Sequence, residues 1–137
     1  RNQRSALFKT MFLAFREAGA CDWNSKLGIA LDHSGQQHYL QFHHIFPKAV
    51  LKDRYAGREI DDIANLCFIA GKTNRGIRDK EPAQYFVDIA SQDKDKAFAT
   101  QCIPTDEQHL SVENYKDFLQ ERRWRIAVRL NEFMKTT

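Results

Sequence analysis

The sequence feature that most constrains the fold is an alternating run that ends at a pair of histidines and is closed off by a proline. In residues 37–43, Tyr39 and His43 fall on one side and His38, Leu40 and Phe42 on the other, a period that is typical of a β-strand. Pro47 lacks a backbone N–H and cannot extend a strand ladder. The pattern therefore predicts a strand whose C-terminal end carries His43 and His44.

A second strand is predicted at residues 66–70, where five apolar residues follow Asn65. The segment between the two strands, residues 47–62, reads as a long irregular connection with one helical turn. A connection of this length in a compact domain usually carries function. After the second strand, a helical turn is expected to begin at Thr73 or Asn74.

Helical periodicity lies near both ends of the chain. Apolar residues recur every three or four positions between Ser5, a predicted N-cap, and Gly19, a natural stop. The same spacing runs from Ser111, also a predicted N-cap, to Phe133. Arg123 interrupts this second stripe, and its aliphatic stem is expected to lie along the core.

Between these patterns, Glu81 and Pro82 open a predicted helix that continues to Ala90, because proline is tolerated in the first helical turn. Residues 91–110 are predicted to form a polar connection. The order helix, strand, strand, helix, helix indicates an α+β fold. A chain of 137 residues with 42% apolar content can bury one core and is too short for two ordinary domains. Residues 1–137 are therefore expected to form a single domain.

Composition excludes several classes of protein. No stretch approaches the roughly 18 to 20 apolar residues that cross a bilayer, and no charged-then-apolar leader opens the chain, so no membrane partner is expected and the protein should be soluble and intracellular. The chain begins with Arg1 rather than Met, which predicts a C-terminal fragment of a longer protein. Cys21, Cys67 and Cys102 form no Cys-x-x-Cys pair and are predicted to be free thiols.

Positive charge is concentrated in two segments, although the formal net charge is only +3. One segment directly follows the second predicted strand, and the other lies near the C-terminus. Both are candidates for phosphate contacts, although a basic helix face is more often merely solvated. The basic residues are Lys72, Arg75, Arg78 and Lys80 in the first segment and Arg122, Arg123, Arg125 and Arg129 in the second.

The histidine pair is suited to phosphodiester hydrolysis. That reaction needs a base to activate water, a cation to balance the charge that grows on the phosphate, and positioning of both. Histidine suits the first task because its unperturbed pKa lies near neutrality. Successive strand residues point to opposite faces, so His43 and His44 are not expected to bind the same ion. One is predicted to hold the metal while the other handles the water.

These residues resemble the HNH endonucleases, whose ββα-metal core consists of two antiparallel strands, a long intervening loop and a helix. Residues 43–47 look like the first motif, Asn65 matches the middle asparagine, and Asn74 matches the third motif residue. The resemblance implies such a core, flanked here by the N- and C-terminal helices. It also implies that His44 is the general base, that His43 and Asn74 hold one divalent cation, and that Asn65 orients the loop carrying the base.

The resemblance also implies a cofactor and a substrate. Many members have Asp where this chain has His43, and an imidazole at that position favours Mn²⁺, Ni²⁺ or Zn²⁺ more than an all-oxygen site does. Mg²⁺ is also compatible with such a site, because it needs few protein ligands. The expected cofactor is therefore Mg²⁺ or Mn²⁺, with Ni²⁺ or Zn²⁺ as the alternatives. The substrate is expected to be DNA, with Lys72, Arg75 and Arg78 contacting its backbone without sequence preference.

Further segments resemble one subgroup, the C-terminal HNH domain of GmrSD-type restriction enzymes. In such proteins this domain follows a nucleotide-hydrolysing module, and together they attack modified or foreign DNA. The resemblance implies an upstream module of that kind in the same parent protein, a role in bacterial restriction or phage defence, and a cytoplasmic location. The segments are residues 20–23, 42–51, 63–78, 103–106 and 111–132.

Two other interpretations stay open. In the first, the chain is a catalytically silent module that keeps the HNH shape and binds nucleic acid. In the second, it is a helical docking domain for the upstream module, with a vestigial nuclease site. Outside the motifs, His33, His38 and His109 are expected to be structural or exposed. Trp23 and Trp124 are expected to pack against apolar segments rather than to stack on bases.

Overall fold

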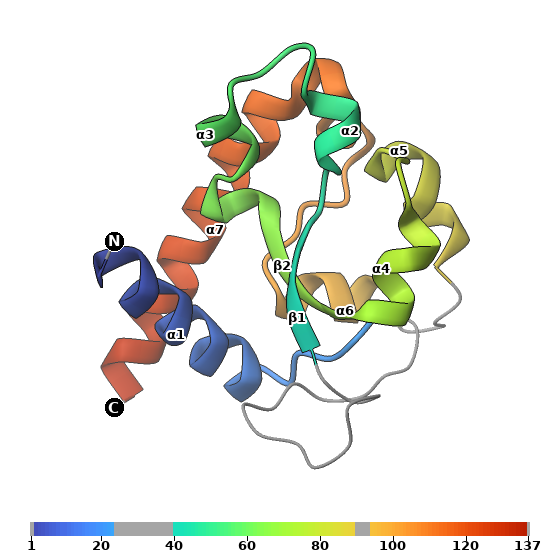
Figure 1. Ribbon diagram of the computed structural model, residues 1–137. Helices are drawn as coiled ribbons and strands as arrows, with labels where there is room; N and C mark the ends of the chain where they lie inside the picture. The colour runs from blue at the N-terminus through green and yellow to red at the C-terminus, as the bar shows by residue number, and fades with distance from the viewer. Residues whose placement is uncertain (1, 24–39, 90–93, 137) are drawn as a thin grey trace.

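The computed structural model describes residues 2–23, 40–89 and 94–136 (Figure 1). Its described part has the predicted α+β class and consists of a two-stranded sheet and seven helices. Four 3₁₀ turns lie between them. In chain order the elements are α1 (Asn2–Glu17), β1 (Leu40–His44), α2 (Lys48–Leu51), α3 (Gly57–Ile60), η2 (Ile63–Asn65), β2 (Leu66–Ala70), α4 (Gly71–Ile77), α5 (Pro82–Tyr85), η3 (Phe86–Asp88), α6 (Lys94–Thr100), η4 (Glu107–His109), η5 (Val112–Asn114) and α7 (Tyr115–Thr136).

The two strands pair antiparallel, with His43 opposite Cys67 and His44 opposite Leu66. The prediction for the second strand is confirmed at residues 66–70, and all five of its residues are buried. The first strand ends at His44, as the position of Pro47 indicated. The N-terminal part of its predicted range, residues 37–39, lies outside the described residues. His33 and His38 also lie outside them.

Two clusters of buried side chains cover the two faces of the sheet, and α7 contributes to both (Figure 1). On one face, Phe68 and Ala70 are in a cluster with Phe12 and Phe15 of α1 and Ile126 of α7. The opposite face carries Cys67 and Ile69, which belong to a larger cluster. Its other members include Trp23, Ile77 of α4, Tyr85 of α5 and Phe98 of α6. The strand that follows Asn65 is apolar throughout because both of its faces are covered.

Helix α1 ends where the sequence predicted but begins earlier. Gly19 has a φ of +88° and follows the helix end at Glu17, which is the left-handed conformation that glycine allows at a helix C-terminus. Ser5 lies inside the helix, so the prediction that Ser5 is the N-cap is wrong. The preceding residues, Asn2 to Arg4, include no proline or glycine to stop the helix.

The middle of the chain departs from prediction in two places. The helix expected from Glu81 to Ala90 ends as α5 at Tyr85 and tightens into a 3₁₀ turn, in which Phe86 stacks on Phe98 with ring centroids 4.2 Å apart. The segment predicted as a polar connection contains α6, whose buried Ala97 and Phe98 fill the larger core. Only three apolar residues, Ala97 to Ala99, mark this helix, and they follow three charged residues, so the sequence shows no helical periodicity here.

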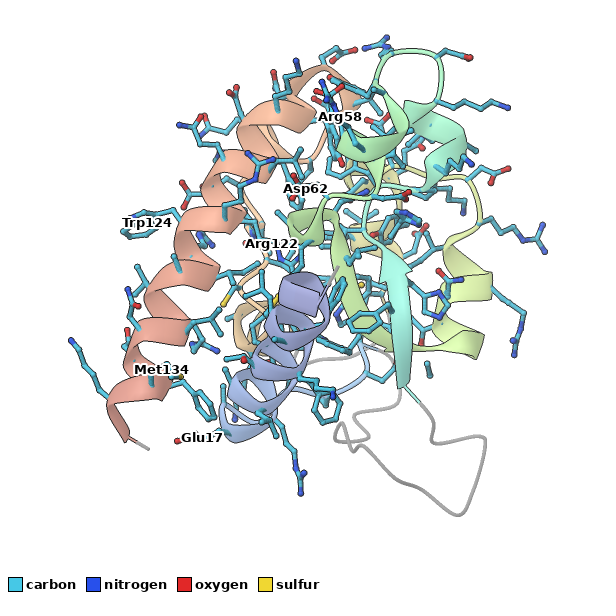
Figure 2. The ribbon with its side chains drawn as sticks, turned by 60° about the vertical axis from the view of Figure 1, so that its left-hand side comes forward. Glu17, Arg58, Asp62, Arg122, Trp124 and Met134 are labelled. Carbon is cyan, nitrogen blue, oxygen red and sulfur yellow. The ribbon has the colours of Figure 1, made fainter. Side chains whose placement is uncertain are left out.

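The C-terminal helix keeps its predicted apolar stripe, with Tyr115, Leu119 and Ile126 buried. It starts one turn later than expected, because the residues after Ser111 form η5, and the Ser111 side chain makes no capping bond. Trp23 is buried, as predicted. Trp124 is 64% exposed on the outer side of α7, so the prediction that it packs is wrong (Figure 2).

The three cysteines are free, as predicted, and Cys67 and Cys102 are buried. Burial raises the pKa of Cys67 to about 12 and raises that of Cys102 as well, so both are protonated thiols at neutral pH and poor metal ligands. Among the described helices, none has the length and apolar content needed to cross a bilayer.

Candidate active site

An open pocket at the C-terminal end of β1 brings together five of the seven residues predicted for the site. Its volume is about 620 Å³. Asn65 is fully buried and does not line this pocket, and the side chain of Lys72, a residue of α4, falls outside the described part of the structure. The lining residues are His43, His44, Pro47, Lys48, Asn74, Arg75, Arg78 and Asp79.

His43 has a ring nitrogen without a partner. Its Nε2 atom is buried and makes no hydrogen bond to the described residues. Burial lowers the pKa of His43, and the nearby His44 lowers it further, so the ring is neutral at neutral pH and keeps a lone pair for a metal ion. A buried polar atom without a partner is rare in proteins, and a divalent cation would satisfy this one.

Asn74 is brought to the same pocket by α4, which follows β2 without a loop. The first turn of α4 is fixed by the buried carboxylate of Asp22, which accepts hydrogen bonds from the Ala70 N–H and the Thr73 hydroxyl, both at 2.7 Å. A carboxylate at a helix N-terminus is also favoured by the helix dipole. Asp22 was not predicted, because no local pattern signals a contact with residues 48 and 51 positions further along the chain.

The predicted ligand set of one imidazole and one amide oxygen is small. Within the described ranges, no group of three or more His, Cys, Asp or Glu side chains is placed to hold a metal. Mg²⁺ and its relatives often keep several waters and take only one or two protein ligands. The unpartnered nitrogen of His43 and the nearby Asn74 amide therefore fit a cation bound mainly through water and substrate oxygens.

His44 is paired with a carboxylate that the sequence did not predict. Its Nε2 atom lies 2.9 Å from Oδ1 of Asp61, which belongs to the connection between the strands. An ionised carboxylate only accepts hydrogen bonds, so Nε2 is the donor and the tautomer follows from the pairing. In the neutral ring, Nδ1 then carries the lone pair and can accept a proton from water.

Asn65 fastens the backbone that follows the histidine pair. Its Oδ1 accepts from the Phe46 N–H at 2.8 Å, and its Nδ2 donates to the Phe46 carbonyl at 3.1 Å and to the Ile60 carbonyl at 2.9 Å. The side chain is fully buried. Asn65 therefore connects Phe46, two residues after His44, to Ile60, the residue directly before Asp61. This geometry suits the orienting role expected for it.

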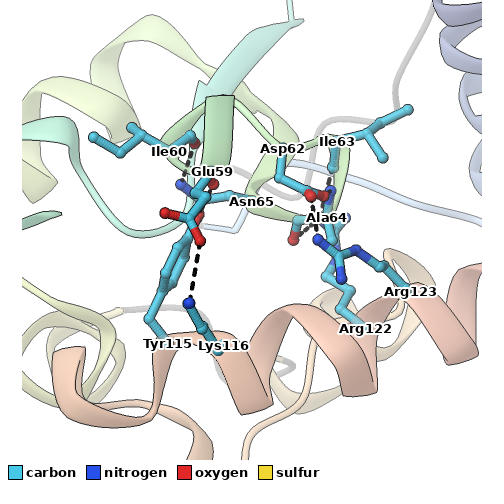
Figure 3. Close-up of polar contacts among 10 residues, drawn as sticks. All are labelled: Glu59, Ile60, Asp62, Ile63, Ala64, Asn65, Tyr115, Lys116, Arg122 and Arg123. Carbon is cyan, nitrogen blue, oxygen red and sulfur yellow. Dashed lines mark hydrogen bonds and ion pairs between the residues drawn. The ribbon is translucent and has the colours of Figure 1, made fainter. Parts of the chain in front are cut away.

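Helix α7 fixes the same connection from the other side (Figure 3). The Tyr115 hydroxyl donates to the Glu59 carbonyl at 2.6 Å, and Arg123 pairs with Asp62. Arg122 donates to the carbonyls of Ala64 and Leu66 at 2.8 and 2.6 Å. The segment that carries Asp61 and Asn65 is thus held by both a buried amide and a long helix.

In the basic segment at the C-terminus, Arg122 is fully buried and cannot reach a phosphate, so the prediction is wrong for this residue. For the other three arginines it stays a prediction. The side chain of Arg123 is 54% exposed and pairs with Asp62, and the packing of its aliphatic stem along the core stays a prediction. Arg125 pairs with Glu121 at 2.7 Å, and Arg129 donates to the Thr100 carbonyl at 3.1 Å.

The basic segment after β2 lies at the pocket instead. Arg75 and Arg78 are exposed and line it, together with Lys48 from α2, which was not predicted. Arg78 ends α4 with a φ of +54°, which turns the chain away from the helix axis. Asp79 also lines the pocket, so its rim carries three positive charges and one negative charge.

Comparison of the chain with protein-family models, with curated proteins and with solved structures found no match. A functional proposal therefore depends on the motif residues and on the geometry described above.

Proposed function

We propose that this chain is a divalent-metal-dependent endonuclease of the HNH type that hydrolyses DNA phosphodiester bonds. One observation carries the proposal: a neutral His43 with an unpartnered Nε2 atom shares a pocket with His44, Asn74 and two exposed arginines. The pocket thus combines a candidate metal ligand, a candidate base and groups that attract a phosphate. These are the functions that phosphodiester hydrolysis requires.

In the proposed reaction, Nδ1 of His44 takes a proton from the attacking water. The water oxygen forms a bond to phosphorus, and the bond between phosphorus and the 3′ oxygen breaks. The leaving 3′ oxygen takes a proton from solvent, so the products are a 3′ hydroxyl and a 5′ phosphate. A divalent cation, held by His43 and Asn74, would balance the charge that develops on the phosphate and the leaving oxygen.

The biological setting is a further part of the proposal. The segments that resemble GmrSD-type enzymes support a place beside an upstream nucleotide-hydrolysing module in a longer bacterial protein. Such a protein would act in the cytoplasm, in restriction or phage defence. The upstream module would bring the DNA, and this chain would cut its backbone.

The proposal is tested by incubating supercoiled plasmid with the 137-residue chain and Mg²⁺, Mn²⁺, Ni²⁺ or Zn²⁺ in turn. We expect nicked or linear plasmid with at least one of these ions, 5′-phosphate ends, and no cleavage in EDTA. Plasmid that stays intact with all four ions, while the chain still binds it at low salt, would identify a silent binding module instead. A chain that neither cleaves nor binds DNA would favour a docking domain.

Arg75 and Arg78 are expected to supply phosphate contacts that do not depend on sequence. Replacing both with Gln should weaken DNA binding equally for unrelated duplexes and reduce the slope of log affinity against log salt by about 2, because two phosphate contacts are lost. Fluorescence anisotropy over a range of salt concentrations measures this slope.

The matched control for this pair replaces Lys9 and Arg16 with Gln. Both residues are exposed on α1, and the change removes the same charge from a helix on the other side of the molecule. We expect the control to keep the slope of the unchanged chain. An equal fall in slope for the two double variants would show that net charge, rather than the pocket, governs DNA binding.

A further inference from the structure

We infer that Asp61 is the positioning residue of the general base and holds His44 in the tautomer that the reaction needs. The inference rests on the function proposed above and adds to it a residue that the motifs do not include. Asp61 touches neither substrate nor metal in this account. It acts only through the ring of His44.

The pairing joins two separate parts of the fold. His44 is the last residue of β1, whereas Asp61 follows α3 and is 17 residues further along the chain. The contact of 2.9 Å between Nε2 and Oδ1 is a hydrogen bond of ordinary length. Because the carboxylate accepts and cannot donate, it requires the proton on Nε2 and leaves the lone pair on Nδ1.

The position of Asp61 is fixed by its neighbours rather than by the pairing itself. Its own N–H donates to the Gly57 carbonyl at 2.9 Å. The carbonyl of Ile60 is held by Asn65, and the Asp62 carboxylate accepts from the Ala64 N–H at 2.9 Å and pairs with Arg123. The carboxylate is therefore presented to His44 by a backbone held on both sides, as a preorganised site requires.

Folding stability gives little reason for this pair to exist. The side chains of His44 and Asp61 are 32% and 59% exposed, and ion pairs this open to water contribute little to stability. The proposed reaction provides a role for the Asp61 carboxylate. When Nδ1 takes a proton, the ring becomes positively charged, and the carboxylate on the opposite nitrogen stabilises that charge while holding the ring in place.

Two measurements on the full 137-residue chain test the inference. The first compares plasmid cleavage by Asp61→Ala with that by Asp53→Ala, a control that removes an exposed carboxylate from the same connection. We expect Asp61→Ala to lower kcat roughly 10- to 100-fold with little change in KM for DNA, and to keep the thermal midpoint of the unchanged chain. Asp53→Ala should keep kcat.

The second measurement reads the tautomer of His44 from its imidazole nitrogen NMR shifts, at a pH at which the ring is neutral. We expect the Nε2–H form in the unchanged chain and a mixture of tautomers in Asp61→Ala. An Nδ1–H ring in the unchanged chain would overturn the inference, as would full kcat in a folded Asp61→Ala. If the unchanged chain cuts no DNA, the proposed function fails, but the NMR measurement still decides whether Asp61 sets the tautomer.

Discussion

Replacing His44 with Ala is expected to lower plasmid cleavage by about 10²- to 10⁴-fold, which is the contribution typical of a general base. The only hydrogen bond found for its side chain in the described structure is the one to Asp61, and the ring is partly exposed. Its removal should therefore leave the fold and the DNA affinity nearly unchanged. Initial cleavage rates at saturating plasmid, measured beside a thermal melt and a binding isotherm, separate the loss of chemistry from any loss of structure.

His109→Ala is the matched control for this prediction. His109 is also a partly buried histidine near a carboxylate, with Nδ1 3.7 Å from Asp106, but it lies in η4 and does not line the pocket of His44. We expect His109→Ala to cut plasmid at the rate of the unchanged chain. A His44→Ala protein that keeps more than a tenth of the original rate would show that another group activates the water or that the cleavage comes from a contaminant.

Replacing Arg122 with Ala is expected to cost about 3 to 5 kcal/mol of unfolding free energy, a large part of the stability of an ordinary domain. The guanidinium is fully buried and donates to the carbonyls of Ala64, Leu66 and Gln101. Burial lowers the pKa of Arg122 to about 10, so it still carries its charge at neutral pH. The substitution leaves a cavity and three buried carbonyls without this donor.

Urea denaturation measures this cost, and Arg123→Ala provides the comparison. Arg123 is the next residue on α7, but its side chain is 54% exposed and its pairing with Asp62 is near the surface. We expect Arg123→Ala to cost less than about 1 kcal/mol. Arg122→Met should lie between the two, because it fills much of the space and makes none of the hydrogen bonds. Equal costs for Arg122→Ala and Arg123→Ala would refute the structural role assigned to Arg122.

Local patterns predicted the two strands, and the resemblance to HNH endonucleases indicated His43, His44 and Asn74 as site residues. The run that ends at Pro47 and the apolar run after Asn65 each indicate a strand without reference to the rest of the chain. Antiparallel pairing puts the start of α4 beside the start of the first strand, because Ala70 lies opposite Leu40. Helix α4 then carries Asn74 to the pocket that His43 and His44 line at the other end of that strand.

The contacts that were missed depend on distant parts of the chain. Arg122 and Arg123 are adjacent and chemically identical, and which one is buried depends on carbonyls that lie about 60 positions earlier. Asp61 reaches His44 only because Asn65 and α7 fix the path of the connection. The apolar face of α6 is short, and it is buried because Phe98 stacks on Phe86 and packs into the larger core. Both partners lie outside the local sequence pattern of α6, so that pattern did not indicate this helix.

The central claim is that His43 and Asn74 share one ion next to His44. Crystals of the 137-residue chain soaked with Mn²⁺ and a short DNA duplex, with the ion located by anomalous scattering, test that claim most directly. We expect one Mn²⁺ in contact with a His43 ring nitrogen and the Asn74 amide oxygen, and a DNA phosphate on the ion beside His44. An ion bound elsewhere, or a His43 Nε2 that pairs with a protein group while Asn74 points away, would contradict it.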